Sequence, residues 1–385
     1  MVSFAQVGND LYTGKRSIDF IGRQKTWYAV SAVLIVLALV GIFARGLNFG
    51  IEFRGGSEFR VSQVANTAGY EDKARTAVGS AGIPGNVVVT LIGGNTVRVQ
   101  TEAADAKNEA AKESLATAFG VGANSISASL IGPSWGASVS TKAIQALVVF
   151  LILVALVMAA YFRTWKMAVA GLVALLHDLI ITVGIYALFG FEITPSSMIG
   201  FLTILGYSLY DTVVVFDKVR ENTAEAFSNR RMTYTQAANL AVNQTLVRSV
   251  NTTVVALLPI AAILVVGITL LGPGTLLDLS LALFVGIGVG AYSSIFIATP
   301  LLVDLRRGEP AVKELDRAAE RVQTKETVRI GAGLQVPTAV DEQLQVTPAS
   351  AGEDESTRTA SGREVHKWAA SGPRNQPKRA PKSKR

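Results

Sequence analysis

The chain has 385 residues, half of them hydrophobic, a formal net charge of +7 and no cysteine. The apolar residues gather in long runs, which excludes an ordinary soluble domain. The absence of cysteine excludes disulfides, thiolate metal sites and cysteine nucleophiles. The positive charge lies mostly in short loops and at the C-terminal end, so it is weak evidence for nucleic-acid binding.

Six apolar stretches approach the length of about 20 residues that a helix needs to cross a bilayer. They are residues 27–43, 143–162, 167–190, 196–216, 250–271 and 276–303. If the six spans alternate in direction, the basic residues of all the short loops fall on one side, which predicts cytoplasmic termini and a multi-pass protein of the plasma membrane. The first stretch is longer than a signal-peptide core and no cleavage site follows it, so we expect a retained anchor.

These spans divide the chain into five parts. We expect a cytoplasmic N-terminus at 1–26, a first membrane helix at 27–44, an extracytoplasmic α+β domain at 45–142, a five-helix membrane domain at 143–303 and a largely disordered, basic cytoplasmic tail at 304–385. The outer segment predicts strands and helices in the order β-α-β-β-α-β, which is the ferredoxin-like arrangement. Residues 304–329 mix charges and are compatible with a partly helical segment, whereas the chain from Gly331 onward has too few apolar residues to fold alone. Its basic end could contact anionic lipid or ribosomal RNA, or could simply be solvated.

Asp211 is the most informative residue, because it lies in the fourth apolar stretch. A carboxyl group at membrane depth is costly and usually faces a bundle interior or a water path. Asp211 precedes Lys218 by seven residues, which places it about 10 Å inside the cytoplasmic end of the helix. A helical spacing of three and four residues puts Tyr207 and Ser208 on the same side.

Arg248, at the start of the fifth stretch, is the candidate partner of Asp211. Because a nearby cation favours the charged carboxylate and desolvation disfavours it, disturbing this pair would bind or release a proton. The sequence therefore predicts an Asp211–Arg248 proton relay. Two alternatives remain open: a purely structural buried pair, and an Arg248 side chain that extends to the lipid headgroups.

Further polar groups accompany this pair. The candidates for supporting it within the membrane are His177, Asp178, Tyr207, Ser208, Asn251 and Thr252. His177 and Asp178 could equally form a satisfied contact between helices. Before the second span, Gly132, Pro133 and Gly136 predict either a hinge or tight docking loop, or an ordinary interfacial loop.

Five segments resemble, in order, the SecF branch of the SecD/SecF protein-export family. They are LNFGIEFRGGS at 47–57, GPSWGASVSTKA at 132–143, HDLIITVG at 177–184, GYSLYDTVVVFDKVREN at 206–222 and NQTLVRSVNTT at 243–253. The resemblance covers roughly residues 15–305. It departs from the family pattern at Tyr210, where the family usually has Asn.

The resemblance implies a polytopic α-helical membrane protein with six transmembrane helices, of the RND half-transporter type, and one ferredoxin-like extracytoplasmic domain. It implies a complex with SecD that uses the proton-motive force to promote translocation, with Asp211 and Arg248 matching the family's membrane acid and arginine. The other implied partners are the SecYEG channel, YajC, translocating preproteins and membrane lipids. The proton is the coupling ion, and we expect no other cofactor, no metal and no enzyme activity.

Two other classes of function were compared with this one. An intramembrane aspartyl protease needs two carboxylates that share a proton, and Asp178 would have to be the partner of Asp211. An RND-like exporter of small molecules or lipids would need larger outer domains than the segment at 45–142 allows.

Overall fold

The computed structural model describes residues 4–83, 85, 87–101, 107–272 and 274–331. The chain falls into two units, Met1–Thr324 and Lys325–Arg385. Part of the predicted tail is helical, since α11 (Thr299–Arg307) and α12 (Pro310–Gly331) extend beyond residue 304. The rest of that predicted disordered tail, from residue 332 onward, lies outside the described residues.

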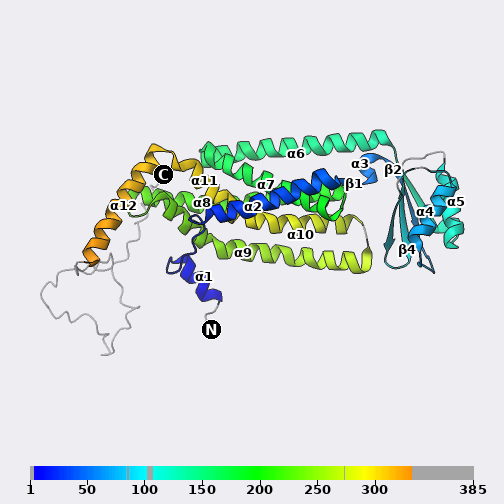
Figure 1. Cartoon of the computed structure of the whole chain (residues 1–385), viewed down its shortest axis with the longest axis horizontal. Coiled ribbons are helices and arrows are strands. Elements are labelled where there is room, and N and C mark those ends of the chain that lie inside the picture. Colours follow the sequence, from blue (N-terminus) through cyan, green and yellow to red (C-terminus); the bar gives the residue numbers. More distant parts are fainter. Residues whose placement is uncertain (1–3, 84, 86, 102–106, 273, 332–385) are drawn as a thin grey trace, which may run out of the picture. The chain divides into compact units, whose positions relative to one another are not determined.

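Six helical stretches of the described chain are long and apolar enough to cross a membrane, as predicted. Their helices are α2 (Gln24–Val40), α6 (Pro133–Phe162), α7 (Trp165–Phe189), α8 (Pro195–Asn229), α9 (Tyr234–Val266) and α10 (Thr275–Ser293) (Figure 1). Three π-helical turns, Gly41–Arg45, Gly267–Leu271 and Ser294–Ala298, extend α2, α9 and α10. A short helix, α1 (Phe4–Tyr12), precedes them. Helices satisfy their own backbone hydrogen bonds in hydrocarbon, so the chain is a multi-pass membrane protein.

The three central helices of the bundle are α7, α8 and α10. About half of each of these apolar spans is buried, namely 56%, 50% and 50%, against 17% for α2, 11% for α6 and 6% for α9. Apolar side chains such as Leu156 on α6 and Val255 on α9 are exposed. The outer helices therefore present apolar surface to lipid or to another membrane protein.

Two helices extend well beyond the predicted spans. The predicted stretch 196–216 covers only part of α8, which continues to Asn229. The predicted stretch 250–271 covers only part of α9, which already begins at Tyr234. The Thr233 side chain accepts a hydrogen bond from the Gln236 backbone, and the Gln236 side chain accepts one from the Thr233 backbone. Because this reciprocal cap starts α9 early, most of the predicted polar loop is helical.

The outer segment contains a four-stranded antiparallel sheet. Its elements are β2 (Gly56–Val61), α4 (Tyr70–Ser80), β3 (Val88–Ile92), β4 (Thr96–Thr101), α5 (Asn108–Phe119) and β5 (Ile126–Ile131), and the strand order is β3-β4-β2-β5. Side chains alternate across the sheet. Phe59 and Val99, which are paired in register, are fully buried with Leu115 of α5. The paired residues Glu58 and Gln100 occupy the opposite, polar face.

The linker between α2 and this sheet is bound to the membrane helices. Strand β1 (Asn48–Phe49) pairs in parallel with β6 (Glu192–Ile193), which connects α7 to α8, and the short helix α3 (Ile51–Arg54) packs against α6. Sequence patterns did not indicate this two-residue pairing, because strands so short have no measurable periodicity.

The predicted glycine and proline loop before the second span is the first turn of α6. Gly132 is the residue before the helix, Pro133 is its first residue, and Gly136 is buried inside it. A Cβ added at Gly136 would lie 2.7 Å from the carbonyl oxygen of Phe53. The segment thus docks α6 onto α3, and its role as a hinge remains a prediction.

Gly286 and Gly288 lie on α10 and provide a matched test of helix packing. A Cβ at Gly286 would collide with Ile204 of α8, whereas a Cβ at Gly288 would meet nothing within 4 Å. We expect Gly286→Ala to lower the thermal midpoint, because overpacking costs about 1–3 kcal/mol. Gly288→Ala should leave it unchanged or raise it, since Ala favours a helix by about 0.5–1 kcal/mol. Equal midpoints for the two purified variants in thermal unfolding would contradict the close α8–α10 contact.

Candidate functional site

Asp211 lies inside the bundle and is held by hydroxyl groups. Its side chain is 6% exposed, and α8 directs it toward α9 and the π-helical turn after α10. Ser249 Oγ donates to Asp211 Oδ1 at 2.7 Å, and Ser294 Oγ donates to Oδ2 at 2.6 Å. The described part of the chain contains no ion pair to this carboxylate. Two hydroxyl donors therefore compensate its burial in place of a cation.

Asp178 is a second buried carboxyl group, on α7, with a similar environment. Ser208 Oγ and Ser293 Oγ lie 2.6 Å and 2.8 Å from its Oδ2. His177 Nδ1 lies 3.0 Å from Oδ1. The other nitrogen of that ring, Nε2, contacts the Ser31 hydroxyl of α2. The expected groups His177, Asp178 and Ser208 are therefore together in one buried polar cluster.

The two acids are connected through consecutive serines. Ser293, the last residue of α10, bonds to Asp178, and Ser294, the first of the π-helical turn, bonds to Asp211. π-Helical turns within membrane helices often occur at functional sites. Each serine also has a second acceptor in its own helix, the Gly290 carbonyl at 3.2 Å and the Ala291 carbonyl at 3.3 Å. The serine hydroxyls can therefore change partner without moving the backbone.

Arg248 contacts Tyr210 and makes no described ion pair with Asp211. Its Nη2 donates to the Tyr210 hydroxyl at 3.0 Å, and both side chains are exposed. The neighbouring residues, Asp211 and Ser249, form the buried contact between the same two helices. Helices α8 and α9 thus make two contacts at this level: Asp211 with Ser249 on the inside, and Tyr210 with Arg248 on the outside. On each helix, the residue of the outer contact immediately precedes the residue of the inner one.

The remaining predicted groups lie around this arrangement. Thr252 donates to backbone carbonyls of its own helix, those of Arg248 and Ser249, each at 3.0 Å. Asn251 is exposed on α9. Tyr207 packs against an apolar cluster that includes Phe201 and Ile204. None of these three side chains contacts Asp211 by a described hydrogen bond.

Sequence reasoning missed four serines of the site. They are Ser31, Ser249, Ser293 and Ser294. Isolated serines are ordinary in membrane helices, so each one alone is a weak signal. The adjacent pair Ser293-Ser294, within an otherwise apolar stretch, was the signal that could have been followed.

The described residues contain no group of three His, Asp or Glu side chains arranged for a metal ion. They also contain no hydrogen bond between the carboxylates of Asp178 and Asp211, which bind separate serines. A shared proton between two acids, as an aspartyl protease requires, has no support in this geometry. The site can bind a proton at a carboxylate and reorient hydroxyl groups around it.

Comparisons with known proteins agree on one family. Residues 111–308 match the family described as protein export membrane protein SecD/SecF, C-terminal, and residues 40–62 match the SecD/SecF GG motif. The chain is 46% identical over 345 residues to protein translocase subunit SecF of Streptomyces coelicolor, covering 89% of this chain and 90% of that one. It is 40% identical over 368 residues to the SecF of Mycobacterium tuberculosis, covering 91% and 82% of the two chains.

A solved structure gives the same result. The crystal structure of SecDF, a translocon-associated membrane protein from Thermus thermophilus, matches with a TM-score of 0.66 and 31% sequence identity. The match covers 76% of this chain and 39% of that one, so this chain spans about two fifths of the solved SecDF chain.

The buried cluster around Asp178 predicts a difference between two substitutions. Asp178→Ala leaves the Ser208 hydroxyl without its described acceptor and leaves Ser293 only the Gly290 carbonyl, and an unsatisfied buried group costs about 1–3 kcal/mol. Asp178→Asn keeps one carbonyl oxygen as an acceptor. We expect the Ala variant to have the lower thermal midpoint in detergent solution. Equal midpoints would show that these hydrogen bonds do not stabilise the bundle.

Proposed function

Because this chain belongs to the SecD/SecF family of protein-export membrane proteins, we propose that it couples proton movement to Sec-dependent export through Asp211. Its relatives are named as protein translocase subunits. The observation that carries the proposal is the environment of Asp211. Its carboxylate is buried, and among the described residues only hydroxyl groups bind it. One of these hydroxyls belongs to Ser249 on α9, the residue next to Arg248.

The first step of the proposed coupling is a change at Ser294. A charged Asp211 accepts the Ser294 hydroxyl at Oδ2. A protonated Asp211 instead donates from that oxygen, so Ser294 Oγ must accept and its own proton turns to the Ala291 carbonyl, 3.3 Å away. Protonation would thereby reverse the hydrogen bond between the two helices and direct the Ser294 proton to a carbonyl of its own helix.

The second step involves Arg248. Successive residues of an α-helix point about 100° apart, since a turn contains about 3.6 residues. A rotation of α9 by one residue would therefore exchange Ser249 for Arg248 beside Asp211. A cation next to a carboxylate favours its charged form, and so favours release of the proton. Pro259 within α9 is a point where the helix can bend, because its nitrogen cannot donate.

The energy for this cycle would come from the membrane. An elementary charge that crosses a potential of 100 mV releases about 2.3 kcal/mol. The path must cross the whole bilayer, and Asp211 is expected only about 10 Å from Lys218, the first basic residue after the apolar stretch of α8, so other groups must carry the proton across the remaining depth.

SecD is the partner we propose for completing the path. A 33% identical relative from Thermus thermophilus is named SecDF, and this chain covers 38% of it. The proposed setting is the plasma membrane with both termini cytoplasmic, where SecYEG, YajC, translocating preproteins and lipids are the further expected contacts. We also class the outer domain as ferredoxin-like, on the strength of its antiparallel strand order and the two helices on one face.

Replacement of Asp211 by Asn tests the proposal directly. The amide has nearly the same shape but cannot bind and release a proton, so we expect loss of proton-gradient-dependent secretion with normal assembly with SecD. Asp217→Asn is the matched control, because Asp217 lies on the same helix and accepts a hydrogen bond from Tyr161 near the helix surface. The measurement is export of a reporter into membrane vesicles with and without an imposed gradient.

Secretion at the normal rate in Asp211→Asn, with SecD still co-purifying, would refute the relay. Failure of SecD to co-purify with the unchanged chain would refute the partner assignment.

A further inference from the structure

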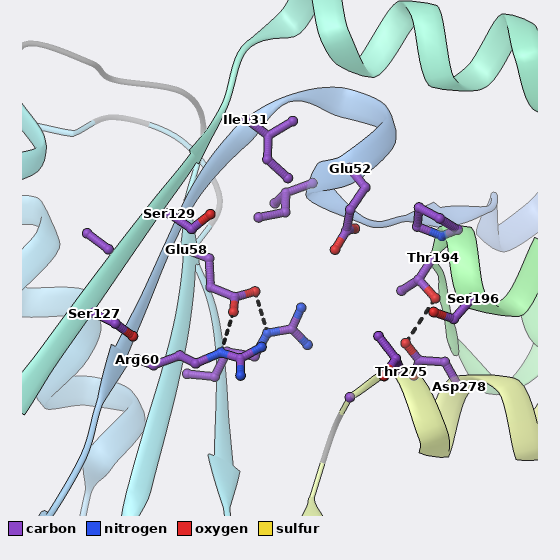
Figure 2. Close-up of a pocket in the computed structure, with 15 residues that line it drawn as sticks. Glu52, Glu58, Arg60, Ser127, Ser129, Ile131, Thr194, Ser196, Thr275 and Asp278 are labelled. Carbon is purple, nitrogen blue, oxygen red and sulfur yellow. Dashed lines mark hydrogen bonds and ion pairs between the residues drawn. The ribbon is translucent and has the colours of Figure 1, made fainter.

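A cavity of about 480 Å³ lies between the polar face of the outer sheet and the outer ends of α8 and α10. Figure 2 shows Glu58 and Arg60 of β2 on one side, Thr194 and Asp278 on the other, and Glu52 of α3 directed into the space between them. The function proposed above uses none of these groups.

Glu192 connects the two sides of this interface. It lies on β6, between α7 and α8, and accepts from two residues of β4 in the outer sheet. Arg98 Nη1 lies 3.4 Å from Oε2, and Gln100 Nε2 lies 3.1 Å from Oε1. Arg98 is also bound to Glu58 within the sheet, at 2.7 Å. The docking of the outer domain on the bundle thus depends on the charge state around Glu192.

Glu52 places a second carboxyl group near Glu192. Its Oε2 is buried and has no hydrogen-bond partner among the described residues. Gly50 makes room for both groups: a Cβ there would collide with Glu52 Oε2 and lie 3.0 Å from Glu192 Oε1. Two carboxylates that both approach the space beside Gly50, one of them with an unpaired buried oxygen, repel each other, and binding a proton at one of them removes that repulsion.

The charged groups nearby leave Glu52 without a cation of its own. Burial raises the pKa of Glu58, but Arg98 and Arg60 outweigh it and hold that pKa below its ordinary value. Arg54, on the helix of Glu52, donates to the Leu47 carbonyl and is exposed. The other charged groups are Asp278, which accepts the Thr194 hydroxyl at 2.9 Å, and Lys142 of α6, which is exposed.

We propose that Glu52 and Glu192 form a proton-binding site at the outer end of the bundle, and that the proton they share secures the outer domain in its docked position. In the protonated form Glu52 donates to Glu192 Oε1, while Glu192 Oε2 remains charged toward Arg98. This site is separate from Asp211.

The pH dependence follows from the direction of the shift at Glu52. Burial first, and then the negative charges of Glu192 and Glu58, raise its pKa above the ordinary glutamate value, while a hydrogen bond from its own backbone and the charge of Arg98 partly oppose the shift. Glu52 holds its proton more tightly in the docked state than when it is solvated. Docking is therefore weakened as the pH rises from the ordinary pKa of glutamate through the raised pKa of docked Glu52. Acid on the outer face therefore favours the docked domain, and alkali releases it.

Distance measurement between two spin labels tests this site in the full chain reconstituted in lipid. The chain has no native cysteine, so Asn124→Cys in the outer domain and Leu276→Cys on α10 can be labelled selectively, and both positions are exposed. We expect a single narrow distance at acid pH that broadens and lengthens as the pH rises. Glu52→Gln, which resembles the protonated form, should stay narrow throughout, whereas Glu113→Gln, an exposed acid on α5, should keep the normal transition.

Glu192→Gln provides a second arm if Glu52→Gln does not fold. Its amide oxygen can still accept from Arg98, but the neighbouring negative charge is gone. The transition should therefore move to lower pH, because the charge of Glu192 is one of the causes that raise the pKa of Glu52. A distance that does not change with pH, or an unshifted transition in both variants, would overturn the proposal. Asp211→Asn should leave the transition intact, which separates this site from the relay.

Discussion

The arrangement of the membrane helices depends on the burial of two carboxyl groups that have no described ion pair with a lysine or an arginine. Asp178 and Asp211 each bind two serine hydroxyls, and the four serines come from α8, α9 and the junction after α10. An unpaired carboxylate inside the bilayer would cost several kcal/mol. The serines on the neighbouring helices must therefore lie at the same depth in the bundle as the acids they bind. Small residues such as Gly286 let the helices approach closely enough for these hydrogen bonds to form.

Hydroxyl groups are suited to a site that changes its protonation state. A serine can donate to a charged carboxylate or accept from a neutral one, so both states can be satisfied with little rearrangement. A permanent ion pair would hold the acid in one state. Arg248 is bound to Tyr210 rather than to Asp211, and it is adjacent in the chain to Ser249, which does contact Asp211.

The outer domain is joined to these helices by its linker and by polar side-chain contacts. The β1–β6 pair and the α3–α6 contact anchor the linker to the bundle. The sheet itself contacts the bundle through Arg98, Gln100 and Glu192, beside a cavity that contains further acids. Strand alternation explains why this face is polar, since the apolar positions of the same strands are used by the core beneath α4 and α5.

The sequence alone determined the six membrane spans, the order of the outer elements, the family and the exceptional position of Asp211, because hydropathy and helical or strand periodicity are local properties. It could not determine the partners of that acid. Arg248 and Ser249 are adjacent in the chain, and only the rotation of α9 against α8 decides which of them faces inward. The same holds for Ser293 and Ser294, because about 100° of helix rotation separates each residue from the next. Glu52 and Glu192 are far apart in the sequence, and only the β1–β6 pairing brings both near Gly50.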